Sequence, residues 1–207
     1  MIAEKSNVPD LVEWIDLGRL HVHAPTTVVL LCGGKIELTA PKPVSLRDAF
    51  ERVRHSPPLA LIEFRRAEEI DLYRPRQIYT NWVDFESHLA QLCQLVLLFC
   101  ESEGSIAELG TFVAIDEIAR KLFVVVDKEI YDRADSYVIL GPVQLLSERY
   151  HTTYIYVLDL NGLNIKSIED VRDIDLVEFR DRIAEELPPA VASHREPRTF
   201  DAGERGM

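Results

Sequence analysis

Residues 95–110 read LVLLFCESEGSIAELG, and this stretch decides the fold class. Its first six residues are apolar without polar alternation, which is typical of a strand buried on both faces of a sheet. A polar turn follows, and then Ile106, Leu109 and Phe112 repeat at helical spacing. A buried strand that leads through a turn into an amphipathic helix is one unit of a parallel sheet covered by helices on both sides.

The chain contains four more apolar runs of the same kind, at residues 27–32, 59–64, 122–126 and 154–158. Residues 82–92 and 106–118 have helical periodicity and separate several of these runs. We therefore predict an α/β, three-layer, Rossmann-like (flavodoxin-like) fold, with about five parallel strands in the order 2-1-3-4-5. A segment at 136–147 interrupts the alternation, and we expect a short strand followed by a helix there.

The predicted domain covers residues 25–187, after an N-terminal extension at 1–24. A last amphipathic helix is expected to end near Leu187. From Pro188 onward the composition shifts to Pro, Arg, Glu, Gly and Ala, so residues 188–207 are predicted to form a mobile tail.

Composition limits the functional classes. The chain has 35 acidic and 23 basic residues, a net charge of −12, which disfavours a protein that neutralises duplex phosphates by itself. The apolar runs are far shorter than the ~20 residues of a membrane span. Three cysteines fit free thiols in the cytoplasm, and their spacing predicts no metal site, since His21 and His23 stand without a second ligand pair.

Two predicted strand ends carry unusual chemistry. Residues 32–35 read CGGK, and residues 101–110 place three carboxylates around a helix start. In the order 2-1-3-4-5 these two loops face each other at the carboxyl edge of the sheet, where open parallel sheets bind ligands. We expect substrate contacts from the glycine loop and from the helix start, namely Cys32, Gly33, Gly34, Gly104 and Ser105.

The acidic residues of the second loop have two interpretations each. Ser105 and Glu108 have the spacing of a capping box, and Glu101 and Glu103 fit solvated loop acids. Alternatively, a Glu108 carboxylate in the first helical turn stays ionised and suits a nucleophile, with a second carboxylate nearby for glycosyl chemistry. For Cys32 we favour a small buried side chain, because no histidine partner is identifiable.

These residues also carry a resemblance. Residues 104–110, GSIAELG, resemble the Gly-Thr/Ser-x-x-Glu-x-Gly motif of nucleoside 2-deoxyribosyltransferases. Together with the run 29–34, the Asp84-Phe85-Glu86 element and the block 98–112, the sequence is similar to deoxyribosyltransferase-like effectors of retron antiphage systems over about residues 25–160. Glu103 is a departure, since proline is usual at this position of those effectors.

The resemblance implies cleavage of an N-glycosidic bond in a nucleoside, a nucleotide or NAD, without a cofactor. It implies that Glu108 is the nucleophile, and it leaves Glu101 and Glu103 open as the second carboxylate. It also implies a reverse transcriptase with multicopy DNA as a partner, and homo-oligomer formation is left open. NAD is mildly favoured because nicotinamide leaves as a neutral base. We expect glycine-loop amides and Lys35 to meet such an anionic substrate.

Two other functions remain open from the sequence. The same cleft suits a non-catalytic nucleotide-sensing module in which Glu108 only caps a helix. The chain also suits a purely interacting subunit that regulates a neighbouring protein.

Overall fold

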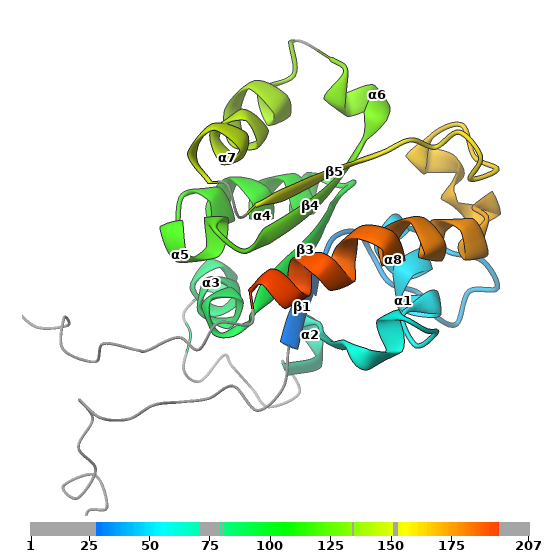
Figure 1. Ribbon diagram of the computed structural model, residues 1–207, viewed down its shortest axis with the longest axis horizontal. Coiled ribbons are helices and arrows are strands. Elements are labelled where there is room, and N and C mark those ends of the chain that lie inside the picture. Colours follow the sequence, from blue (N-terminus) through cyan, green and yellow to red (C-terminus); the bar gives the residue numbers. More distant parts are fainter. Residues whose placement is uncertain (1–27, 71–78, 80, 134, 151–152, 195–207) are drawn as a thin grey trace, which may run out of the picture. The chain divides into compact units, whose positions relative to one another are not determined.

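The structure, a computed structural model, describes residues 28–70, 79, 81–133, 135–150 and 153–194. Its centre is a sheet of five parallel strands in the order β2-β1-β3-β4-β5 (Figure 1). The strands are β1 (Val28–Cys32), β2 (Glu63–Arg65), β3 (Leu95–Cys100), β4 (Leu122–Asp127) and β5 (Tyr154–Leu158). The predicted α/β class and strand order are confirmed.

The central strand shows why two helical layers are needed. All six residues of β3 are buried, and alternate side chains point to opposite faces of the sheet. Leu95, Leu97 and Phe99 belong to one apolar cluster, and the other three residues of the strand belong to a second cluster. The two clusters are the interfaces of a three-layer fold.

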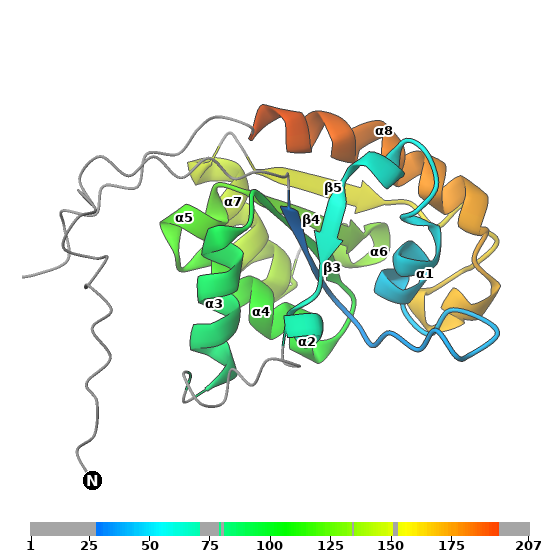
Figure 2. The ribbon, with the colours of Figure 1, turned by 90° about the horizontal axis from the view of Figure 1, so that it is seen from below.

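Each cluster is covered by its own helices, and Figure 2 shows the two groups on opposite sides of the sheet. The first face carries α1 (Leu46–Val53), η7 (Ile168–Asp173) and α8 (Leu176–Ser193). The second face carries α3 (Trp82–Leu92), α4 (Glu103–Val113), α5 (Asp116–Ala119), η6 (Ile139–Val143) and α7 (Gln144–Arg149). The remaining short elements are η3 (Leu59–Leu61), α2 (Ala67–Ile70) and α6 (Lys128–Tyr131).

Two predicted strands differ from the structure. The apolar run at 59–64 begins as a 3₁₀ turn that buries Leu59 and leaves Leu61 90% exposed, and only Glu63–Arg65 pair with β1. The segment at 136–147 contains no strand and forms η6 and α7 instead. η6 is a wide π-type turn, and Pro142 within it has no N–H to donate, which suits a turn of altered hydrogen bonding.

The last helix is longer than the sequence predicts. α8 continues through Pro188 and Pro189 to Ser193, so the predicted helix end near Leu187 was wrong. Ala190 and Val191 extend the buried face of the helix, with 0% and 2% exposure. Their burial offsets the free-energy cost of the helical hydrogen bonds that the two prolines cannot donate. The predicted extension 1–24 and the remainder of the tail, 195–207, lie outside the described residues. In the described part of the chain, no helix is long and apolar enough to span a membrane.

Candidate active site

The loop after β3 starts its helix earlier than the sequence predicts. α4 begins at Glu103, with Ser102 as its N-cap. The Ser102 hydroxyl accepts from Ser105 N at 3.2 Å, and the buried Ser105 hydroxyl accepts from Ser102 N at 2.9 Å. Ser102 and Ser105 therefore form the capping box of α4. The predicted capping box between Ser105 and Glu108 was wrong.

Glu108 lies in the second turn of α4 and takes no part in the capping box of this helix. Its Oε2 atom is buried and has no hydrogen-bond partner among the described residues. Burial, together with the negative charges of Glu86 and Glu68, raises the pKa of Glu108 to about 7, although the charge of Arg47 opposes this rise. The expectation that the helix dipole keeps this group ionised was wrong, because Glu108 is outside the first turn and its desolvation is the larger effect.

The charges of three residues act on Glu108: Arg47 of α1, Glu68 of α2 and Glu86 of α3. We did not select these residues from the sequence. Arg47 is 5% exposed, and its guanidinium donates two hydrogen bonds of 2.8 Å to the largely exposed carboxylate of Glu68. This is the paired geometry in which arginine binds a carboxylate most strongly.

The positions of Arg47 and Glu68 relative to the strands could have pointed to them from the sequence. Arg47 and Glu68 lie in the first turns of the helices that follow β1 and β2, at the same edge of the sheet as the loop after β3. Glu86 belongs to the Asp84-Phe85-Glu86 element, one of the elements that carry the resemblance. A search of the sequence for charged residues in the first turns after strands would have added Arg47 and Glu68, which we did not select there.

Cys32 shares this environment at the end of β1. It is buried, and burial raises the pKa of its thiol well above the ordinary value. The charge of Glu108 raises this pKa further, and the charge of Arg47 opposes the rise. The thiol stays protonated, which is the weakly nucleophilic form.

Glu101 binds the protein's own backbone. Its Oε1 accepts from Gly34 N at 3.0 Å and from Arg47 N at 2.9 Å, and its Oε2 accepts from Leu46 N at 2.5 Å. Burial raises the pKa of Glu101, while these three donors and the charge of Arg47 oppose the rise and favour the carboxylate form. The Gly34 amide, which we expected to offer to a ligand, is thus already donated within the protein.

The glycine loop is packed against the same side chains. A Cβ on Gly34 would lie 3.0 Å from Glu101 Cδ and 2.9 Å from Ser45 Cβ. Gly33 has φ +146°, and a Cβ there would lie 3.0 Å from Phe99 Cβ. Both glycines therefore have a structural explanation in close packing and, for Gly33, in backbone conformation.

Glu103 and Gly104 occupy the exposed start of α4. A Cβ on Gly104 would meet only Ser102 Oγ, at 3.9 Å, so this residue borders open space. The structure thus separates the three predicted acids, since Glu101 faces the backbone of α1, Glu103 faces outward, and Glu108 joins Glu86 and Glu68.

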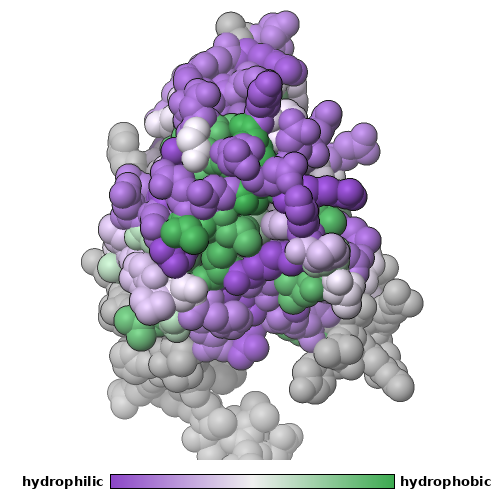
Figure 3. All heavy atoms as spheres, turned by 90° about the vertical axis from the view of Figure 1, so that its right-hand side faces the viewer, coloured by the Kyte–Doolittle hydropathy of each residue, from purple (hydrophilic) through white to green (hydrophobic). Residues whose placement is uncertain are grey.

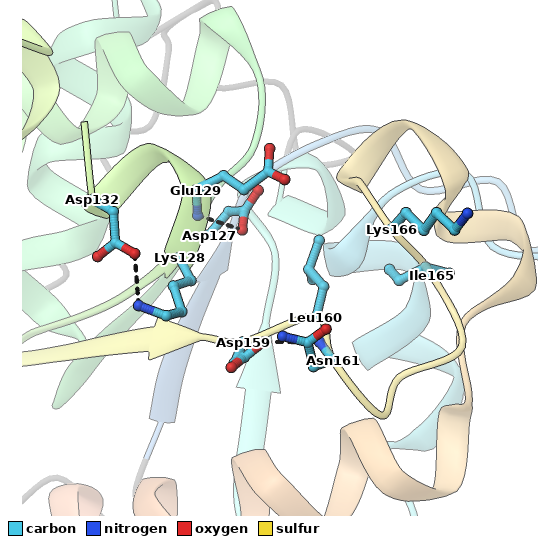
Figure 4. Close-up of a pocket in the computed structure, with 9 residues that line it drawn as sticks. All are labelled: Asp127, Lys128, Glu129, Asp132, Asp159, Leu160, Asn161, Ile165 and Lys166. Atoms are coloured by element: carbon cyan, nitrogen blue, oxygen red, sulfur yellow. Dashed lines mark hydrogen bonds and ion pairs between the residues drawn. The ribbon is translucent and has the colours of Figure 1, made fainter.

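A separate pocket of about 310 Å³ lies beyond β4 and β5 (Figure 4). Asp127 lines it and accepts from Glu129 N at 3.1 Å, and Lys128 pairs with Asp132 at 2.6 Å. Its other lining residues are Asp159, Leu160, Asn161, Ile165 and Lys166. Figure 3 shows hydrophobic side chains ringed by hydrophilic ones on the right-hand side of Figure 1, where the loop after β5 lies.

The described residues contain no group of three His, Cys, Asp or Glu side chains that could hold a metal ion. His21 and His23 lie outside those residues. The predicted absence of a metal site stays a prediction for the whole chain.

Comparison of the sequence with known proteins assigns the chain to a family. The chain is 26% identical over 127 residues to a protein of Escherichia coli whose name describes it as a ribosyltransferase and DNA-binding protein of retron Ec86. The match covers 57% of this chain and 36% of that relative, so the chain spans about a third of the relative's length. The family model of the STM3845 retron effector protein matches residues 43–206, which is more than half of the chain. The chain therefore belongs to the STM3845 retron effector family.

Proposed function

We propose that this retron effector cleaves the N-glycosidic bond of a nucleoside, a nucleotide or NAD, as the toxic component of an antiphage system, with Glu108 as the reacting carboxylate. The observation that carries the proposal is the buried Oε2 of Glu108, which has no hydrogen-bond partner among the described residues, together with a pKa of about 7 for this carboxyl group. The name of the retron Ec86 relative, a ribosyltransferase, supports glycosyl transfer as the class of reaction.

The proposed chemistry uses the ionised form of Glu108 as the nucleophile. Its carboxylate attacks the anomeric carbon, the bond from that carbon to the base nitrogen breaks, and the electron pair leaves with the base. Water then hydrolyses the glycosyl ester and frees the carboxylate. A pKa near 7 leaves a substantial ionised fraction at neutral pH, because the group is half ionised at its pKa.

Glu86 is our candidate for the second carboxylate, in place of Glu101 and Glu103. Burial raises the pKa of Glu86, and the charge of Glu68 raises it further, while Arg47 opposes the rise. The negative charge of Glu86 is one of the causes that raise the pKa of Glu108, so Glu86 is already ionised when Glu108 loses its proton. In the reacting form Glu108 attacks as a carboxylate, and the Glu86 carboxylate takes a proton from the water that hydrolyses the glycosyl ester.

The charge of the cluster favours NAD as the substrate. Three carboxylates, on Glu68, Glu86 and Glu108, lie around the guanidinium of Arg47. Such a site stabilises positive charge, and the nicotinamide of NAD is a pyridinium before it leaves as a neutral base. The reaction then needs no strong acid at the leaving group.

The partner and location of the effector are part of the same proposal. We propose a reverse transcriptase with its multicopy DNA as the partner that holds a cytoplasmic effector in check. The name of the Ec86 relative includes DNA binding, and the net charge of −12 disfavours direct contact between this chain and a duplex without help from a partner. Homo-oligomer formation, which the sequence left open, is not part of this proposal.

The decisive experiment measures released base. Purified protein, with and without the reverse transcriptase and its multicopy DNA, is incubated with NAD and with deoxynucleosides, and products are separated by chromatography. We expect base release that Glu108→Gln abolishes and that Glu103→Gln, an exposed acid of the same helix, preserves. Ligand binding without base release in every condition would instead favour a nucleotide-sensing module.

A further inference from the structure

The start of α1 has the layout of an anion site. In open parallel sheets, the loop after the first strand and the N-terminus of the next helix present backbone N–H groups that bind ligand phosphates. In this protein the N–H groups of Gly34, Leu46 and Arg47 converge at this position. The group that they bind is the Glu101 carboxylate, which comes from the end of the neighbouring strand β3.

The remaining donors at the start of α1 are also taken by the protein. Ser45 Oγ accepts from Asp48 N at 2.8 Å, and Asp48 Oδ2 accepts from Val44 N at 3.0 Å. Ser45 O accepts from Ala49 N at 2.9 Å. The first N–H groups of α1 are therefore bound to protein oxygens, which is what a buried helix start requires.

The glycine loop is shaped around this carboxylate. A Cβ on Gly34 would approach Glu101 Oε1 to 3.0 Å, so the absence of a side chain makes room for Glu101. Lys35, the nearby cation that we expected to meet an anionic substrate, pairs with Glu37 at 2.7 Å. The Gly34 amide is thus already donated, and the exposed Lys35 ammonium is paired with a carboxylate at the surface.

We propose that Glu101 is the resident anion of this site, a specificity-determining residue that excludes phosphate from the loop after β1 and fixes the backbone of Arg47. For the proposed function, on which this one consequence rests, a phosphorylated substrate must place its phosphates elsewhere, with only its sugar and base near Glu108. The proposal does not depend on the reaction, because it concerns the occupancy of three amides.

Inorganic phosphate is the probe. Thermal unfolding of the full chain is followed at rising phosphate concentration at constant ionic strength, for the wild type, Glu101→Ala and the matched control Glu103→Ala. We expect Glu101→Ala to unfold at a lower temperature and to gain a Tm increase of about 3–6 °C for each tenfold rise in phosphate above its Kd. The wild type and Glu103→Ala should show no such increase. Equal phosphate responses in all three proteins would overturn the proposal.

A second measurement covers the case in which Glu101→Ala does not fold. Phosphate is titrated into ¹⁵N-labelled wild type, and the amide signals of Gly34, Leu46 and Arg47 are followed. We expect these three signals to stay in place. Saturable shifts at all three would show that phosphate displaces Glu101 and would refute its role as the resident anion. Base release is not measured in either experiment, so failure of the proposed reaction would leave this result unaffected.

Discussion

Replacing Glu108 with glutamine should stabilise the protein at alkaline pH while abolishing its proposed reaction. The wild-type side chain must ionise above pH 7 in a buried position, where Glu86 and Glu68 repel its charge. Glutamine has nearly the same shape and never ionises. Burial destabilises the ionised form of this side chain, but the proposed reaction requires it. Such a conflict is expected at an active site, because function there competes with stability.

The size of this effect follows from the two pKa values. The folded value of about 7 exceeds the ordinary value of 4.5, so the folded state binds the proton more tightly than the unfolded chain. The contribution to stability is therefore complete below pH 4.5 and is lost as the pH rises through 7. The interval of about 2.5 pH units corresponds to about 3 kcal/mol. The advantage of Glu108→Gln should grow by about 2–3 kcal/mol between pH 5 and pH 8, or about 5–10 °C in Tm.

The measurement is urea unfolding followed by circular dichroism at pH 5, 6, 7 and 8. Any fixed cost of the glutamine amide is common to all four pH values, so the slope against pH isolates the ionisation of residue 108. Glu103→Gln is the control, since Glu103 is exposed on the same helix and its neutralisation should change stability by less than about 1 kcal/mol at every pH. A stability difference between Glu108→Gln and wild type that does not vary with pH would refute the reasoning.

Three further predictions test the surroundings of the site. Glu86→Gln removes a negative charge and should lower the pKa of Glu108, so the acid limb of the pH profile for base release should move to lower pH. Lys121→Met removes a fully buried ammonium that donates to two main-chain carbonyls, and urea unfolding should show a loss of about 2–4 kcal/mol. The native protein should resist iodoacetamide at pH 8 and react fully in urea, because burial raises the thiol pKa values of Cys32, Cys93 and Cys100.

The strands were predictable where burial on both faces leaves no polar alternation. β3 has its predicted limits, and β4 differs from its predicted range only by including Asp127. β2 was misplaced because Glu63–Arg65 is a short edge strand with charged residues at both ends, and an apolar run beside it favours the wrong position. Edge strands need only one partner, so their sequences carry a weaker signal.

The candidate site was only partly predictable for a different reason. Glu108 was selected from its motif, but its pKa depends on burial and on the charges of Arg47, Glu68 and Glu86, which come from three other helices. Local spacing favoured a capping role for Glu108, whereas the N-cap proved to be Ser102. Helix starts shift by a few residues with little change in sequence pattern, and such a shift moved Glu108 from the first turn into a buried position.

The two inferences about this loop support each other chemically. Glu101 points to the face of the sheet that carries α1, where backbone N–H groups neutralise its charge. Glu108 lies on α4, which covers the other face, where no described donor reaches its buried oxygen. The loop after β3 thus holds the Glu101 carboxylate, whose charge is neutralised by three donors, and the helix that follows it holds Glu108, whose buried Oε2 has no described donor. A positive charge that develops on a bound sugar would therefore stabilise the ionised Glu108 more than Glu101. Glu101 also fixes the backbone of Arg47, the cation that acts on Glu108. This division favours Glu108 as the reacting group and Glu101 as the residue that positions its surroundings.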